Sequence, residues 1–295
     1  MTMADKIIIR APAKINLGLT VHGSRPDGFH EIESVMQQVS LADTLYLELT
    51  SGSEIVFQCT DPALAGPENL VCRAAEKLKC RADRFVPGVN IVLYKNIPVE
   101  AGLAGGSADA AAVLKGLNTI WQLNLPQETL LELGAELGSD IPFCIEGGTA
   151  LARGRGELLE KLPASPFFWV VLALPPRAKV STAATYGGFD RNFLGQPSLD
   201  RLIEALRKGE KEAILMWMGE ELTNTLATAD LPEASSSREL KDDLIACGLE
   251  PQLSGSGPTL FMLFNSQSEA GRALRAVGEA GARAYLCWTE NVEGK

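Results

Sequence analysis

Alternating apolar and polar positions predict β-strands in the N-terminal part of the chain. Between residues 14 and 21 every second side chain is apolar, which is typical of a strand with one apolar and one polar face. A short apolar run at residues 7–9 predicts a separate strand before it. Runs at residues 44–49 and 55–58 are joined by a Ser-Gly-Ser segment, which predicts that these two strands pair.

Helical spacing dominates much of the remaining chain, with further short strands between the helices. The predicted helices cover residues 69–79, 107–121, 127–137, 199–208, 210–222, 238–247 and 269–280. The predicted strands cover residues 89–94, 149–152, 168–174, 260–264 and 284–288. This mixture predicts an α+β fold. A Leu-Pro-Ala-Ser-Pro segment predicts a linker between an N-terminal domain, residues 1–163, and a C-terminal domain, residues 164–295.

Composition narrows the class of protein. The 295 residues are 46% hydrophobic and 22% charged, as in ordinary globular proteins. A net charge of −10 argues against a protein that coats nucleic acid through a basic face. Residues 1–10 reach charged positions at once, and the longest apolar run, residues 167–176, is too short to span a bilayer. We therefore expect neither a nucleic-acid partner nor a membrane partner.

Cysteine usage predicts a reducing compartment. The six cysteines are scattered and form no C-x-x-C pair; they are Cys59, Cys72, Cys80, Cys144, Cys247 and Cys287. In a chain of this length they are expected to be reduced and mostly buried, which favours a cytoplasmic location. No metal centre is predicted, because His22, His30 and the cysteines form no cluster with the spacing of metal ligands.

The segment from Pro98 to Ala112, Pro-Val-Glu-Ala-Gly-Leu-Ala-Gly-Gly-Ser-Ala-Asp-Ala-Ala-Ala, is the most informative in the chain. A predicted strand leads into this glycine-rich loop, which opens onto an alanine-rich helix. Glycine lets the backbone approach a ligand closely, and a helix start offers unpaired N–H groups to an anion. The loop lacks both a Walker A ending and the spacing of a dinucleotide fingerprint. It predicts a phosphate-binding site whose charge is neutralised partly from elsewhere in the chain.

Polar residues at two places in the chain are candidates for catalysis. Lys14 and Asn16 share the polar face of one predicted strand, so a cation and an amide point the same way; the alternative is an exposed strand lysine. Asp140 follows a predicted helix and precedes an apolar segment, where an aspartate can act as a general base. The alternative for Asp140 is a turn or helix-capping residue.

Three further features are candidates for ligand binding. Phe29 and His30 directly follow the turn at residues 25–28 and offer a ring and an imidazole to a nucleobase; the alternative is a buried Phe and an incidental loop His. The Ser-Gly-Ser-Gly-Pro segment at residues 254–258 brings backbone N–H groups to a ligand or forms an ordinary turn. Ser107 is predicted as a helix N-cap and is a candidate contact for phosphate or Mg²⁺.

Three segments, in this order, resemble the three motifs of the GHMP kinases: residues 12–17 (Pro-Ala-Lys-Ile-Asn-Leu), 98–112 and 253–259 (Leu-Ser-Gly-Ser-Gly-Pro-Thr). Residues 25–30, 137–143 and 147–150 extend the resemblance, which runs from about residue 8 to residue 288. It implies the two-domain GHMP kinase fold. The N-terminal domain would resemble ribosomal protein S5 domain 2 and hold ATP, and the C-terminal domain would be ferredoxin-like.

The resemblance also implies the reaction. ATP with Mg²⁺ would phosphorylate the 2-hydroxyl of 4-(cytidine 5'-diphospho)-2-C-methyl-D-erythritol, giving the 2-phosphate and ADP, in the non-mevalonate (MEP) pathway to isoprenoids. Asp140 would be the general base, and Lys14 would hold Asp140 and the hydroxyl in place. The residues implied to bind ATP are Pro98, Val99, Glu100, Ala101, Gly102, Leu103, Ala104, Gly105, Gly106, Ser107 and Ala108. The residues implied to bind the substrate are Asn16, Phe29, His30, Tyr186, Gly255, Ser256 and Gly257.

Within the implied substrate site, His30 would read the cytosine edge, Phe29 would stack on the base and Tyr186 would close its other face. Many relatives carry tyrosine at position 29 and a second serine at position 108, so this chain lacks a phenol and a hydroxyl there. The alternatives are a homoserine or mevalonate type of GHMP kinase, a nucleotide-binding regulator without catalysis, and a scaffold protein. We expect a monomer or a weak homodimer that acts on a small molecule.

Overall fold

The computed structural model describes residues 5–176, 182–188, 198–219, 222–229 and 234–291. The chain forms two compact units that are interleaved along the sequence. The first unit comprises Met1–Ala13, Ala42–Val99 and Ala104–Glu146, and the second comprises Lys14–Leu41, Glu100–Leu103 and Gly147–Lys295. The sequence analysis divides the chain at a single boundary, between residues 163 and 164. That domain boundary stays a prediction.

Two long strands, β1 (Lys6–Ser24) and β2 (His30–Thr50), pass through both units. The separate strands predicted at residues 7–9 and 14–21 are therefore one strand, β1. Pro12 lies within it, because the fixed φ of proline is compatible with extended backbone.

The sheet of the first unit places β4 (Gly88–Tyr94) between β2 and β3 (Ile55–Cys59). β4 pairs antiparallel with β2 and parallel with β3. The predicted direct pairing of residues 44–49 with residues 55–58 is wrong. Val89, Ile91 and Leu93 are fully buried, so β4 is an apolar strand that satisfies its backbone on both sides.

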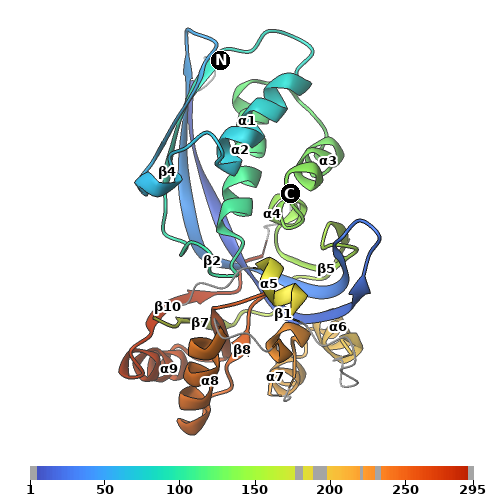
Figure 1. The fold of residues 1–295 in the computed structure, drawn as a ribbon, viewed down its shortest axis with the longest axis vertical. Helices are drawn as coiled ribbons and strands as arrows, with labels where there is room; N and C mark the ends of the chain where they lie inside the picture. Colours follow the sequence, from blue (N-terminus) through green and yellow to red (C-terminus); the bar gives the residue numbers. More distant parts are fainter. Residues whose placement is uncertain (1–4, 177–181, 189–197, 220–221, 230–233, 292–295) are drawn as a thin grey trace. The chain divides into compact units, whose positions relative to one another are not determined.

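The helices of the first unit pack together beside this sheet (Figure 1). They are α1 (Leu70–Arg81), α2 (Gly105–Ile120), α3 (Gln127–Leu137) and α4 (Ile141–Glu146), with a short 3₁₀ turn, η1 (Pro62–Leu64). α2 lies directly on β2, since a Cβ atom added to Gly116 would lie 2.5 Å from Leu47 Cδ1. The small residues of α2 thus permit close packing.

In the second unit, β2 continues into pairing with β5 (Thr149–Arg153), which pairs with β6 (Leu158–Lys161). A separate antiparallel sheet has the order β10-β7-β9-β8. Its strands are β7 (Trp169–Leu174), β8 (Gln252–Leu253), β9 (Leu260–Phe264) and β10 (Arg283–Trp288). The other elements are α5 (Thr182–Gly187), α6 (Asp200–Lys208), α7 (Lys211–Met218), η2 (Thr225–Thr228), α8 (Ser235–Ala246) and α9 (Gln267–Glu279).

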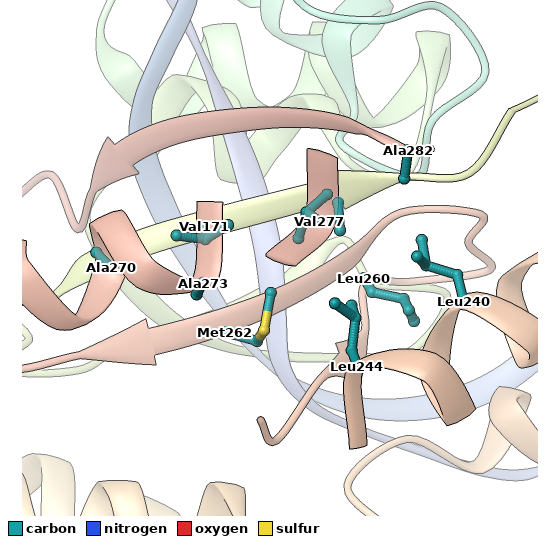
Figure 2. Close-up of a cluster of buried hydrophobic side chains, with 10 residues drawn as sticks. Val171, Leu240, Leu244, Leu260, Met262, Ala270, Ala273, Val277 and Ala282 are labelled. Atoms are coloured by element: carbon teal, nitrogen blue, oxygen red, sulfur yellow. The ribbon is translucent and has the colours of Figure 1, made fainter. Parts of the chain in front are cut away.

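Side chains of helices α8 and α9 form a hydrophobic core with this sheet (Figure 2). Leu244 from α8 and Val277 from α9 are fully buried in one cluster with Val171 of β7 and Met262 of β9. A four-stranded antiparallel sheet that shares a hydrophobic core with two helices agrees with the predicted α+β class.

Two simpler expectations can be compared with the structure. All six cysteines are free, but only Cys144 and Cys287 are buried, and Cys80 and Cys247 are exposed, so the expectation of mostly buried cysteines is wrong. Among the helices of the described segments, none has the length and apolar character needed to cross a bilayer.

Candidate functional site

The first motif presents a buried lysine on β1. Lys14 is 4% exposed, and its Nζ donates a hydrogen bond to Asn16 Oδ1 at 2.7 Å. Asn16 Nδ2 in turn donates to Ser34 Oγ of β2 at 2.8 Å. The alternative of an exposed strand lysine is therefore wrong. A cation removed from water needs polar partners, and this chain of hydrogen bonds orients it.

The second motif lies beside the first. The backbone N–H of Lys14 donates to the carbonyl of Leu103 at 3.1 Å. Glu100 (φ 55°) and Ala104 (φ 56°) both adopt left-handed backbone, which costs about 1 kcal/mol or more for a residue with a Cβ atom. Such strain clusters at ligand-binding loops, so it agrees with a loop shaped to hold a ligand.

The third motif lies next to both other motifs within the second unit. Ser254 Oγ donates to the carbonyl of Gly102 at 3.2 Å. A Cβ atom on Gly102 would lie 2.6 Å from the Ser254 carbonyl oxygen, and one on Gly255 would lie 3.2 Å from Asn16 Oδ1 and 3.5 Å from Lys14 Nζ. Three segments far apart in the sequence thus meet around Lys14.

The remaining residues of the glycine loop lead into α2. Ala101 and Leu103 are buried, Pro98 is half-buried and Val99 is exposed. The N-cap of α2 is Ala104, so the prediction of Ser107 as N-cap is wrong; Ser107 lies in the first turn of the helix.

The first N–H groups of α2 have no capping side chain. Gly105 and Gly106 stand at this end of the helix, and Ala108 is 2% exposed and packs inside. An uncapped helix start that follows a glycine loop suits an anionic ligand.

Asp140 directly precedes α4 in the first unit and is half-buried. Its backbone carbonyl accepts a hydrogen bond from Cys144 N at 3.1 Å. Lys115 of α2 donates from Nζ to the Cys144 carbonyl at 3.2 Å, and burial lowers the pKa of this lysine. α4 is thereby hydrogen-bonded to α2, the helix that follows the glycine loop. The pairing of Asp140 with Lys14 stays a prediction.

His30, at the start of β2, lies next to Tyr186 of α5 in the second unit. The rings of His30 and Tyr186 are 5.2 Å apart at an interplanar angle of 33°. Phe29 is 48% exposed, with the guanidinium of Arg155 4.8 Å from its ring centroid. The alternative of a buried core phenylalanine is therefore wrong.

A pocket opens beside the third motif. Ser256, Gly257 and Pro258 form part of its lining, and Thr185, the neighbour of Tyr186, forms another part. The segment predicted to support a ligand thus borders a pocket within the second unit.

Models of the GHMP kinase N-terminal domain and of the GHMP kinase C-terminal domain match residues 69–148 and 202–283. A 4-diphosphocytidyl-2-C-methyl-D-erythritol kinase of Exiguobacterium sibiricum is 47% identical over 90% of this chain and 92% of its own length. The chain belongs to the GHMP kinase family. A Listeria monocytogenes protein with the same name is 43% identical and covers 97% of both chains.

Solved structures agree with this GHMP kinase assignment. The crystal structure of a 4-(cytidine 5'-diphospho)-2C-methyl-D-erythritol kinase has a TM-score of 0.79 and 33% identity over 97% of this chain and all of its own. A homoserine kinase from Cytophaga hutchinsonii has a TM-score of 0.73 at 20% identity, covers 99% of this chain and 96% of its own, and shows the fold alone. The predicted GHMP kinase fold and small-molecule kinase class are confirmed, and kinases of this family use ATP.

Sequence reasoning missed three residues that shape the site of this GHMP kinase. Asn224 donates from Nδ2 to the carbonyls of Leu253 at 2.9 Å and Gly255 at 2.8 Å, so it holds the third motif in place. Ser34 fixes the amide of Asn16, and Arg155 covers Phe29. None of these residues belongs to a recognisable motif, because their contacts join segments that are distant in the sequence.

Proposed function

We propose that the protein transfers the γ-phosphate of ATP to the 2-hydroxyl of 4-(cytidine 5'-diphospho)-2-C-methyl-D-erythritol (CDP-methylerythritol). The products would be the 2-phosphate and ADP, and the reaction would belong to the non-mevalonate route to isoprenoids. The names of relatives at 42–47% identity support this substrate. The observation that carries the choice is the ring pair of His30 and Tyr186, because a cytosine needs such a surface, whereas mevalonate and homoserine have no ring.

Phosphoryl transfer requires mainly positioning and neutralisation of charge. In this proposal the glycine loop and the first turn of α2 hold the phosphates through backbone N–H groups. The hydroxyl of Ser107, in that turn, fits as a protein contact for Mg²⁺. A bound Mg²⁺ would supply positive charge against the phosphates.

We assign the proton transfer to Asp140. Its carboxylate would take the proton of the 2-hydroxyl as that oxygen attacks the γ-phosphorus. Lys14 would stabilise the carboxylate and the hydroxyl, since Asn16 already holds its ammonium group in one orientation. Gly255 supports this role because its missing side chain leaves room next to Lys14 Nζ.

The substrate assignment is tested by coupled ADP release with three acceptors. We expect CDP-methylerythritol to give a kcat/KM at least about 100-fold above those of homoserine and mevalonate, because the cytosine contacts have no counterpart in the other two. Preference for either alternative acceptor would contradict the assignment. ATP binding without ADP formation from any of the three would favour a nucleotide-binding regulator.

Replacing His30 with alanine tests the cytosine site. We expect the KM for CDP-methylerythritol to rise about 10- to 100-fold, since a lost ring contact and hydrogen bond are worth roughly 1.5–3 kcal/mol. The kcat should change by less than about threefold, because His30 is not assigned to the reacting atoms. Steady-state kinetics at varied acceptor concentration measures both values.

His22→Ala is the matched control, because His22 is exposed on β1. This variant should behave like the unmodified protein. A His30→Ala variant with unchanged KM would return His30 to the role of an ordinary loop residue.

A further inference from the structure

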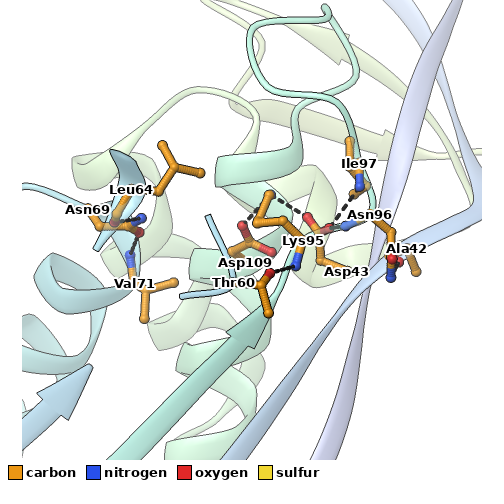
Figure 3. A network of polar contacts seen from close by, with 10 residues as sticks. All are labelled: Ala42, Asp43, Thr60, Leu64, Asn69, Val71, Lys95, Asn96, Ile97 and Asp109. Atoms are coloured by element: carbon orange, nitrogen blue, oxygen red, sulfur yellow. Dashed lines mark hydrogen bonds and ion pairs between the residues drawn. The ribbon is translucent and has the colours of Figure 1, made fainter. Parts of the chain in front are cut away.

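A buried ionic cluster lies in the first unit, next to the glycine loop (Figure 3). Lys95 follows β4 and pairs its Nζ with Asp43 of β2 and, at 2.8 Å, with Asp109 of α2. The side chains are 9%, 0% and 3% exposed, respectively. Charges removed from water to this degree are expensive unless they are paired, so their arrangement is tightly constrained.

The cluster anchors the segment that enters the loop. Asp43 Oδ1 accepts hydrogen bonds from the backbone N–H groups of Asn96 and, at 2.8 Å, Ile97. The backbone N–H of Lys95 donates to Thr60 Oγ1 at 2.9 Å. Since Pro98 comes next, the chain enters the loop from a fixed position.

The same ammonium group anchors the helix at which the loop ends. Asp109 lies in the N-terminal part of α2 and accepts from Lys95 Nζ through Oδ2. A Cβ atom on Gly105, the first residue of α2, would lie 3.0 Å from Ile97 Cγ2 and 3.3 Å from Lys95 Nζ. Both ends of the loop are therefore packed against one side chain.

The cluster has one cation for two carboxylates. Burial raises the pKa of Asp109 to about 7; the charge of Lys95 opposes this shift and that of Asp43 adds to it. The Cys59 thiol on β3 also faces these charges. Asp109 Oδ1 is buried without a hydrogen-bond partner in the described segments, which disfavours the ionised form.

We propose that Lys95, Asp43 and Asp109 are positioning residues for the nucleotide, because they fix both ends of the phosphate-binding loop. This inference rests on the proposed binding of ATP at the loop.

The test compares Asp109→Ala with Asp109→Asn, using a non-hydrolysable ATP analogue in isothermal titration calorimetry. Alanine removes the bridge from α2 to Lys95, so the Kd should rise about tenfold while kcat changes by less than about threefold. Asparagine keeps an acceptor for Lys95. Its Kd should stay within about threefold of the original value.

The split between Kd and kcat, together with rescue by asparagine, separates positioning from general stability. A merely structural loss would weaken both variants and would lower kcat as well.

Glu136→Ala is the matched control, because Glu136 is a largely exposed carboxylate of the first unit and pairs with Lys77. It should leave the Kd unchanged. The proposal is overturned if folded Asp109→Ala has the original Kd, or if Asp109→Asn raises the Kd as much as Asp109→Ala does. Analogue binding needs no acceptor, so an error in the proposed acceptor would change turnover and leave this result intact.

Discussion

Asparagine in place of Asp140 is expected to lower kcat with CDP-methylerythritol by about two to four orders of magnitude, the usual contribution of a general base. The amide has nearly the size of the carboxylate, so the start of α4 should keep its structure. It cannot accept the proton that the 2-hydroxyl loses. The KM for ATP should change by less than about threefold, because the ATP loop is intact. Coupled ADP release measures both quantities.

Asp243→Asn is the matched control for this variant. Asp243 is exposed on α8, and its substitution removes the same charge without touching the proposed site. It should leave kcat unchanged. If Asp140→Asn keeps a near-normal kcat and the circular dichroism of the unmodified protein, Asp140 has no part in proton transfer.

Alanine in place of Gly102 should damage both stability and activity. Its Cβ atom would lie 2.6 Å from the Ser254 carbonyl oxygen and 2.7 Å from that of Gly257, and backbone atoms cannot move aside cheaply. Overpacking and left-handed backbone (φ 73°) together should lower the unfolding free energy by about 2–5 kcal/mol. Because the loop must shift, kcat/KM for ATP should fall about 100-fold. Urea unfolding and steady-state kinetics measure the two effects.

Gly248→Ala separates steric conflict from backbone strain. Gly248 has nearly the same φ, 74°, but a Cβ atom there would meet nothing within 4 Å. We expect a loss of about 1 kcal/mol of stability and normal activity. Equal effects of the two substitutions would show that contact between the second and third motifs is unimportant.

Local elements follow closely from the sequence. The helix predicted at residues 127–137 and the strand predicted at residues 260–264 have the bounds of α3 and β9. Their apolar spacing is regular and their ends carry turn-forming residues, so nearby positions alone determine them. The short helix α4 has no such repeat, and the sequence predicts no helix directly after Asp140.

Contacts between distant segments could not be predicted in this way. The sequence suggests that β3 pairs with β2, but β4 lies between them, because an apolar strand from later in the chain competes for both edges. Lys14 is buried next to Gly255, and Arg155 lies over Phe29. In both cases the two contacting segments are more than a hundred residues apart in the sequence. The meeting of the three motifs was expected only through the family resemblance.

The interleaving of the two compact units affects how this protein can be divided or recombined. Residues 14–41 and 100–103 belong to the second unit, although most of that unit begins at Gly147. An exchange of C-terminal halves between two such kinases would therefore join strand and loop segments from one parent to a sheet from the other. A faithful swap must transfer all three segments, and substitutions that adapt one segment to a new substrate need matching changes in the other two.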